Sequence, residues 1–233
     1  MTDMHSHILP GVDDGSRNLE ESIAMLRAEA AQGIGHVIAT PHFDARYDDP
    51  ERFLARREGA AEALRREMEK YPELPRISLG AEVRYFRGIS DWDDLSRLTV
   101  GGKRAVLIEM MPQPWPESAL QELSDIWHKQ GLVPVIAHIE RYIGPFGSRK
   151  LMTRLEKMPV KIQASASFFL ERRTALQAMR MLKHGRIHLL GSDCHNMTTR
   201  KPDLGEAIRR IQRNLGPIAL ERIGRYEKQI LEE

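Results

Sequence analysis

The sequence lacks features that mark several large classes of protein. It contains a single cysteine, Cys194, so an internal disulfide is excluded and a reducing compartment is favoured. No stretch approaches the roughly twenty apolar residues of a membrane-spanning helix, and the first residues show no basic segment followed by an apolar run. We therefore expect a cytoplasmic protein that does not insert into a membrane.

Charge of neither sign is in large excess. Lys and Arg total 35 against 33 Asp and Glu, a formal net charge of +2, so any attraction to an anion must be local. Aromatic residues make up only 6% of the chain, and no basic stripe with interleaved aromatic residues occurs. Nucleic acid is therefore not an expected partner.

Strand and helix patterns alternate along a chain whose length of 233 residues suits one large domain, expected over residues 1–233. Runs rich in β-branched residues, with two weaker and more polar segments, predict seven strands: Asp3–Ile8, Gly35–Thr40, Ile77–Val83, Ala105–Ile108, Val133–Ala137, Lys161–Ala164 and Arg186–Leu190. Helical periodicity and capping residues predict helices after Asn18, over Pro50–Lys70, Pro116–Gln130, Arg149–Lys157 and Glu171–Lys183, and from Asp203 to Gly216.

This alternation predicts an α/β fold in which seven parallel strands and their helices form a (β/α)7 TIM-like barrel. An open doubly wound sheet is the alternative. It is disfavoured because no G-x-G-x-x-G segment follows a strand, and because such a sheet would not gather residues from every strand end. In a barrel, function is expected on the loops at the carboxyl ends of the strands.

Each predicted strand runs into a short polar cluster, and these clusters contain residue types that bind metal ions. Successive strand ends are separated by 27 to 40 residues, close to one strand-loop-helix unit, so their side chains are expected to meet at one mouth. The candidate ligands are His5, His7, Asp14, His42, Glu82, Glu109, His138, Asp193 and His195. The other four histidines, His36, His128, His184 and His188, do not lie at strand ends and are not expected to be ligands.

Two of these motifs place ligand-type residues two positions apart. In extended chain His5 and His7 point to the same side, and Asp193 and His195 repeat the spacing, which leaves Cys194 facing away as a packing residue. Any one of these polar residues alone could be a hydrogen-bonded structural group. Nine buried polar groups together would each need a partner, whereas two or three cations satisfy them all, so a polynuclear metal site is predicted.

Mixed imidazole and carboxylate ligands suit manganese, iron or zinc, and the residues do not choose among these metals. Asp13-Asp14-Gly15 can also be an ordinary turn, and Asp14 is the favoured ligand of the two acids.

The motifs together resemble those of bacterial capsule-cluster tyrosine phosphatases, the CpsB/CapC branch of the polymerase and histidinol phosphatase (PHP) superfamily. The resemblance spans Met1 to about Asn214 and rests on His5-Ser6-His7-Ile8-Leu9-Pro10-Gly11-Val12-Asp13-Asp14-Gly15, Thr40-Pro41-His42, Gly80-Ala81-Glu82, Ile108-Glu109, His138-Ile139-Glu140-Arg141-Tyr142 and Ser192-Asp193-Cys194-His195-Asn196. It implies a distorted (β/α)7 TIM-like barrel of the PHP type with two or three divalent metal ions, usually manganese.

The resemblance further implies hydrolysis of phosphotyrosine on the tail of a tyrosine autokinase that controls capsule or exopolysaccharide synthesis. By the same resemblance Arg141 and Arg200 match phosphate-binding arginines. Arg141 could instead form a surface ion pair with Glu140. Loop position alone suggests that Arg46, Tyr47 and Trp115, with Tyr85 and Phe86, line the mouth around a substrate ring. Each of these loop residues could equally serve loop packing.

Other functions remain open at this point. A histidinol-phosphatase-like enzyme or another small-molecule phosphoesterase would share the metal chemistry, and a metal-stabilised regulatory module would bind ions without turnover. A cysteine-dependent tyrosine phosphatase is disfavoured, because Cys194 lies between two candidate ligands and lacks a Gly-rich phosphate cradle. The oligomeric state is not predicted.

Overall fold

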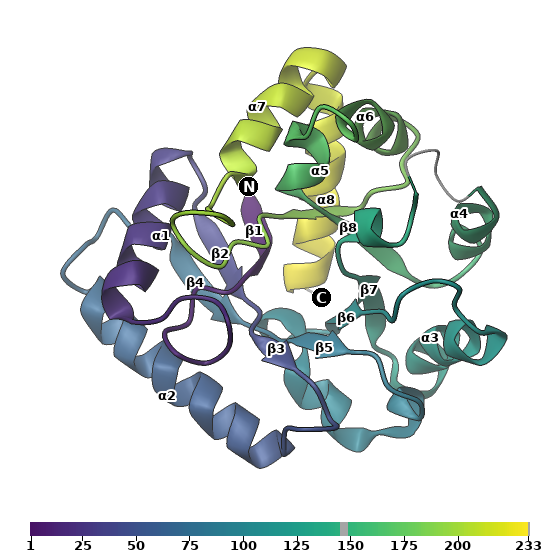
Figure 1. Ribbon diagram of the computed structural model, residues 1–233, viewed down its shortest axis with the longest axis horizontal. Helices are drawn as coiled ribbons and strands as arrows, with labels where there is room; N and C mark the ends of the chain where they lie inside the picture. Colours follow the sequence, from purple (N-terminus) through teal and green to yellow (C-terminus); the bar gives the residue numbers. More distant parts are fainter. Residues whose placement is uncertain (145–148, 233) are drawn as a thin grey trace.

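Parallel strands form the inner layer of the molecule and helices surround them, as the computed structural model, which describes residues 1–144 and 149–232, shows (Figure 1). The strands are β1 (Thr2–Ser6), β2 (His36–Ala39), β3 (His42–Phe43), β4 (Arg76–Leu79), β5 (Glu82–Arg84), β6 (Ala105–Glu109), β7 (Val133–Ile136), β8 (Lys161–Ser165) and β9 (Leu189–Gly191). They pair in the orders β1-β2-β4 and β3-β5-β6-β7-β8-β9, and every pairing between these strands is parallel.

The curled sheet closes where its first and last strands meet. The amide of His7 donates to the carbonyl of Cys194 at 2.9 Å, and the amide of Asp193 donates to the carbonyl of His5 at 2.8 Å. A parallel bridge joins Ser6 to Cys194. The predicted α/β barrel of the PHP type is therefore confirmed, and its closure brings the two ligand pairs at the ends of the chain together.

The barrel is distorted because its strands are interrupted at two places. The segment predicted as one strand, Ile77–Val83, is β4 and β5, separated at Gly80 and Ala81. The predicted strand Gly35–Thr40 is β2, and the short β3, which was not predicted, follows it after Thr40 and Pro41. Pro41 has no amide hydrogen to continue the ladder. A side chain at Gly80 would meet the Cα of Val100 at 3.3 Å, so only glycine fits without displacing the neighbour. These steps carry the chain from one sheet into the other.

Eight α-helices lie in the described residues: α1 (Leu19–Ala31), α2 (Pro50–Met68), α3 (Glu117–Gln130), α4 (Arg149–Leu155), α5 (Ala166–Leu170), α6 (Ala175–Lys183), α7 (Leu204–Leu215) and α8 (Pro217–Glu232). Short 3-10 helices cover Ile89–Asp91, Asp93–Leu98, Val100–Gly102 and Ile139–Arg141. Within the described parts of the chain, none of the helices has both the length and the apolar character that crossing a bilayer requires.

The predicted caps hold at one of two helices. The side chain of Asn18 accepts from the amide of Glu21 at 2.9 Å and begins α1 as expected. The capping box predicted at Asp203 is wrong, since its side chain makes no capping hydrogen bond to α7. Asp203 has a ψ of 11°, so it lacks the extended backbone that Asn18 has and that N-cap residues typically adopt.

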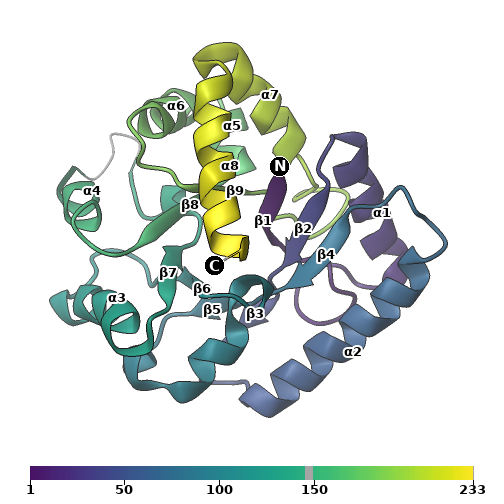
Figure 2. The ribbon, with the colours of Figure 1, turned by 180° about the vertical axis from the view of Figure 1, so that it is seen from behind.

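Helix α8, which the sequence did not predict, crosses the end of the barrel opposite the mouth (Figure 2). Its Ile230 joins a small buried cluster with inward-facing residues such as Met4 and Leu107. The larger core lies between the outward faces of the strands and the surrounding helices. One end of the barrel is therefore filled with apolar side chains, and the polar strand ends are left to the other.

Candidate metal centre

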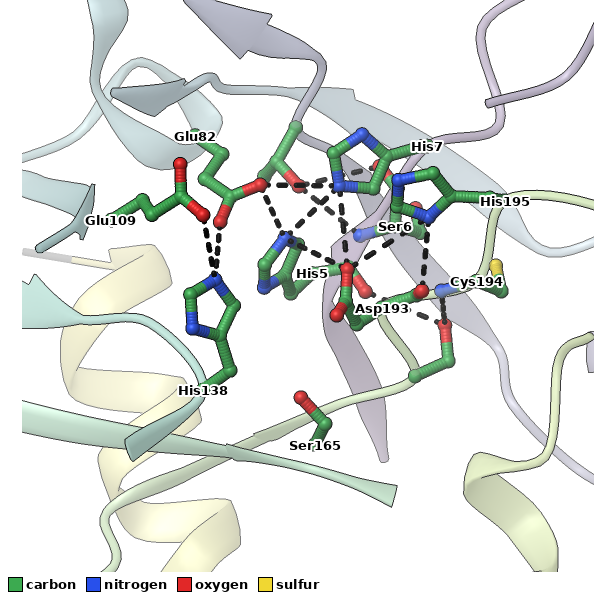
Figure 3. Close-up of polar contacts among 12 residues, drawn as sticks. His5, Ser6, His7, Glu82, Glu109, His138, Ser165, Asp193, Cys194 and His195 are labelled. Carbon is green, nitrogen blue, oxygen red and sulfur yellow. Dashed lines mark hydrogen bonds and ion pairs between the residues drawn. The ribbon is translucent and has the colours of Figure 1, made fainter. Parts of the chain in front are cut away.

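The nine predicted ligands lie at the carboxyl ends of the strands and form one connected set of contacts. Figure 3 shows the part of this set that contains His5, His7, Glu82, Glu109, His138, Asp193 and His195. They come from β1 and the loop after it, from β3, β5 and β6, and from the turns that follow β7 and β9. The members are His5, His7, Asp14, His42, Glu82, Glu109, His138, Asp193 and His195.

Four donor atoms converge at the centre of this set. The Nε2 atoms of His5 and His7 are 3.1 Å apart, and they lie 3.1 and 3.3 Å from Glu82 Oε2. Asp193 Oδ1 is 3.5 Å from each of these two nitrogens. Four ligands held about 2.1 Å from one ion in a tetrahedron lie about 3.4 Å from one another. The spacing therefore fits a single metal ion.

Two further donor groups adjoin the first. Asp14 Oδ1 is 3.4 Å from the Nε2 atoms of both His42 and His195, and His7 lies in the same group. On the other side, His42 Nδ1 is 3.0 Å from Glu82 Oε2, and Glu109 completes that group. Because Glu82 belongs to two groups, it could bridge neighbouring ions. The donor set therefore consists of three overlapping groups, which share His7, His42 and Glu82.

His138 extends the set through Glu82. Its Nε2 is 2.6 Å from Glu82 Oε1 and 3.8 Å from Glu109 Oε1. His138 and Asp193 have φ values of 31° and 55°, which residues other than glycine seldom adopt. Such backbone strain concentrates at functional sites, where the surroundings hold the residue in place. The two residues are turned from their strand ends toward the shared centre.

Two residues that the sequence did not identify orient the candidate ligands. Asp13 Oδ2 lies 2.7 Å from His7 Nδ1 and also accepts from the amide of His42 at 2.9 Å. Gln163 accepts from the amide of His138 at 2.6 Å and lies 3.5 Å from His5 Nδ1. A carboxylate on one imidazole nitrogen fixes the other nitrogen as an acceptor, as in carboxylate-histidine-metal arrangements. The available signals were the second acid beside Asp14 and a polar residue inside a buried strand.

The charges of the site are buried together. Burial favours neutral His5, but the carboxylates of Glu82 and Asp193 outweigh it and raise the pKa of His5 above its ordinary value. Burial likewise raises the pKa of Glu82, but His5, His138 and His42 lower it well below the ordinary range. Glu82 therefore stays ionised, as a metal ligand must.

Several ligand atoms are held by ion-pair contacts without a hydrogen bond. In the described part of the chain, Glu82 Oε2, Asp193 Oδ1 and His195 Nε2 are buried and have no hydrogen-bond partner, although charged groups approach each of them. A bound cation would give all three atoms a direct ligand contact. The donor set, mixed in imidazole and carboxylate and free of thiolate, fits a divalent ion of the manganese, iron or zinc type.

Two arginines extend over the donor set. Arg141 Nη2 is 2.8 Å from Asp193 Oδ2, and its Nη1 is 3.2 Å from Glu109 Oε1. Arg200 Nη2 is 2.7 Å from Asp193 Oδ1. The alternative ion pair between Arg141 and Glu140 is wrong, because Glu140 instead accepts from the amide of Ser165 at 3.2 Å. Both guanidinium groups are partly exposed, so they face the site and the solvent together.

The predicted substrate-contacting residues differ in exposure. Tyr47 is 83% exposed, and its ring lies 5.1 Å from the guanidinium of Arg46. Trp115 is only 8% exposed, donates from Nε1 to the carbonyl of Met111 at 2.7 Å and packs on Tyr142. The prediction that Trp115 lines the mouth is therefore corrected, because its ring is committed to the core.

Cys194 is a packing residue, as predicted. Its side chain is fully buried, and burial, followed by the charges of Asp3 and Glu29, raises the pKa of the thiol well above its ordinary value. A thiol that stays protonated is a poor nucleophile. The thiol therefore takes no part in the chemistry of the mouth.

Fold and site together define a distorted PHP-type α/β barrel whose mouth carries a candidate polynuclear metal centre. The chain belongs to the CpsB/CapC family of capsular polysaccharide synthesis proteins, whose family model matches residues 1–231. It is 29% identical to the tyrosine-protein phosphatase CpsB of Streptococcus agalactiae over 226 residues, which cover 93% of this chain and 91% of that protein.

Two further comparisons agree with the family. The tyrosine-protein phosphatase YwqE of Bacillus subtilis is 31% identical over 223 residues, which cover 93% of this chain and 85% of that protein. A solved structure from a study of YwqE from Bacillus subtilis and CpsB from Streptococcus pneumoniae, described as unique metal-dependent tyrosine phosphatases, superposes with a TM-score of 0.86 at 28% identity. The match covers all of this chain and 94% of that one.

Proposed function

We propose that this chain is a metal-dependent tyrosine-protein phosphatase of capsule or exopolysaccharide synthesis. Family membership supports this reading, as do the relatives named as tyrosine-protein phosphatases. The observation that carries it is the convergence of nine ligand-type side chains beneath two arginines. The proposal includes a single domain over residues 1–233, manganese as the metal, and the tail of a cytoplasmic tyrosine autokinase as substrate.

Each part of the site answers a difficulty of phosphate-ester hydrolysis. The charged oxygens of a phosphate monoester repel a nucleophile, and the uncatalysed reaction is among the slowest known. When bound, divalent ions would neutralise phosphate charge and lower the pKa of a water molecule toward about 7. The nine side chains described above would hold these ions, and Asp13 would keep His7 in the tautomer that presents Nε2.

The arginines would bind and orient the phosphate. A guanidinium has five N–H donors in a fixed plane, and Arg141 donates one N–H to each of two carboxylates, those of Glu109 and Asp193. Its remaining N–H groups, with those of Arg200, can donate hydrogen bonds to the phosphate oxygens of a substrate. The phenolate of tyrosine has a pKa near 10 and leaves more readily than an alkoxide, so strong acid assistance is not needed. An aryl phosphate therefore suits this site.

The proposal is tested by comparing substrates with and without metal. The purified chain is assayed with manganese on a phosphotyrosine peptide with neutral flanks and on a small alkyl phosphate such as histidinol phosphate. We expect the peptide to give the higher kcat/KM, and chelation followed by dialysis to abolish turnover until manganese is restored. The variant His138→Ala should lose activity, whereas His128→Ala, on the exposed face of α3, should not.

Two results would contradict the proposal. Undiminished turnover after exhaustive removal of metal would show that the donor set has no catalytic ion. A preference for the alkyl phosphate would favour the alternative function, a small-molecule phosphoesterase.

A further inference from the structure

Arg84 lies on β5, two residues after the candidate ligand Glu82. Alternate residues of a strand face the same side, so Arg84 points to the same side as Glu82 and Val83 points into the outer core. Two residues of extended chain place Arg84 about 7 Å nearer the rim than Glu82. The register of the sheet pairs Arg84 with Glu109 on β6. Arg84 therefore lies at the level of Glu109, one inward-facing position nearer the rim than Glu82.

A second arginine reaches the same part of the rim. Asp44, two residues after His42, follows β3, which lies beside β5 (Figure 1). Arg46 binds both carboxylate oxygens of Asp44, from Nε to Oδ1 at 2.9 Å and from Nη2 to Oδ2 at 2.5 Å. Arg84 Nε is 3.8 Å from Asp44 Oδ2, which is farther than the two contacts of Arg46. Two guanidinium groups thus share one carboxylate, which leaves one positive charge in excess.

Both arginines are accessible to a ligand. The side chains of Arg46 and Arg84 are 54% and 51% exposed, whereas that of Asp44 is 19% exposed. They also differ from Arg141 and Arg200, which contact the candidate ligand Asp193. The rim arginines are therefore available for a group other than the phosphate bound at the centre.

The length of phosphotyrosine fits this separation. When its phosphate reaches the donor set, the aromatic side chain holds the peptide backbone away from the centre, at the level of the rim. Residues next to the phosphotyrosine would then pass close to Arg84. A carboxylate on such a residue would bind the excess positive charge through charge-assisted hydrogen bonds, which the planar guanidinium group favours.

We propose that Arg84, supported by Arg46, forms a carboxylate-binding subsite that selects phosphotyrosine flanked by Asp or Glu. The inference rests on the proposed phosphatase function and adds a substrate class to it. An exposed charge-assisted contact changes kcat/KM by about three- to tenfold, mainly through KM, and the effect weakens as salt rises.

The test uses pairs of phosphotyrosine peptides that differ only in Glu or Gln at one position, from two residues before to two residues after the phosphotyrosine. The wild-type chain with manganese should prefer Glu over Gln about three- to tenfold at one position or more. In Arg84→Gln the Glu to Gln ratio should fall toward one, and Arg84→Lys should keep part of it. Arg66→Gln, on the exposed face of α2, is the matched control and should keep the full ratio.

The outcomes separate this inference from the function on which it rests. Turnover of the peptides with a wild-type ratio near one at every position would overturn the subsite alone, as would an unchanged ratio in Arg84→Gln. Absence of turnover on all peptides would overturn both proposals. If Arg84→Gln fails to fold, the wild-type ratio at low and high salt still decides, since a ratio that does not fall with added salt contradicts a charged contact.

Discussion

Replacing Asp13 with asparagine is expected to weaken metal binding without removing a ligand. Asp13 is mostly buried, and its carboxylate receives the amides of Gly15 and His42 at 3.0 and 2.9 Å as well as the 2.7 Å contact from His7 Nδ1. These contacts, with that from His7 foremost, hold the pKa of Asp13 well below its ordinary value, so it is ionised at any working pH. It therefore fixes the proton of His7 on Nδ1 and leaves Nε2 free to bind an ion.

The size of the effect follows from these contacts. An asparagine amide has one acceptor oxygen, so it cannot accept at both Oδ positions and must turn an N–H toward a donor. Loss of such an orienting partner costs 10- to 100-fold in metal affinity, or about 1.4 to 2.7 kcal/mol. Titration of the metal-free protein with manganese, followed by phosphatase activity, measures this loss.

Comparison with the neighbouring acid makes this prediction specific. Excess manganese should restore most activity to Asp13→Asn, but not to Asp14→Ala, which removes a candidate ligand. Asp125→Asn, at a partly exposed acid of α3 that pairs with Lys129, is the control and should bind metal as the wild type does. Unchanged metal affinity in Asp13→Asn would refute the orienting role, and activity of Asp14→Ala equal to the wild type would refute the assignment of Asp14.

Three other substitutions or treatments test separate parts of the structure. Gly191→Ala should abolish activity and lower Tm, because its Cβ would lie 2.6 Å from the Cβ of His5, whereas Gly59→Ala, with open space around it, should retain both. Glu29→Gln should change the pH dependence of stability, since burial, followed by the charge of a neighbouring acid, raises the pKa of Glu29 to about 10. Alkylating reagents should leave the folded protein active, since Cys194 is buried and its thiol protonated.

Proton binding by Glu29 determines whether the free energy of unfolding rises or falls with pH. The folded protein keeps a proton on Glu29 that the unfolded chain releases above its ordinary pKa of 4.5, so this group lowers stability as pH rises from 4.5 toward 10. The slope is at most about 1.4 kcal/mol per pH unit. We expect the free energy of unfolding of Glu29→Gln, relative to that of the wild type, to increase by up to about 3 kcal/mol between pH 6 and pH 8. Urea unfolding in the presence of a chelator measures this difference.

Each of these three predictions has a contrary result. A constant stability difference across pH would mean that Glu29 is ionised in the folded state. Full activity of Gly191→Ala would mean that β1 can move without disturbing His5. Inactivation by an alkylating reagent at the rate of an exposed thiol would place Cys194 in contact with solvent.

The sequence predicted the mouth of the barrel well because its signals are local. A polar residue that ends an apolar run, such as Glu109 at the end of β6 or His138 after β7, marks the carboxyl end of a buried strand. Parallel strands bring all such ends to one side, so convergence follows from topology without knowledge of distances. The five histidines at strand ends all lie in the connected set, and the orienting role of Asp13 explains why two acids stand before Gly15.

The remaining features depend on contacts between distant segments. Whether Trp115 faces the mouth or the core is decided by Tyr142 and the carbonyl of Met111, which no local pattern reveals. The division of the predicted strand at Gly80 reflects the close approach of Val100 from another segment. Similarly, α8 is recognisable as part of the fold only when its Ile230 meets the inner face of the barrel.

Anomalous scattering from crystals of the manganese-loaded protein tests the metal centre most directly. The structure predicts an ion among the converging atoms of His5, His7, Glu82 and Asp193, with at least one more among the adjoining groups that contain His42. Binding should displace the close contact between His5 Nε2 and His7 Nε2 in favour of shared coordination. A fully active protein with no anomalous density among these side chains would contradict the account.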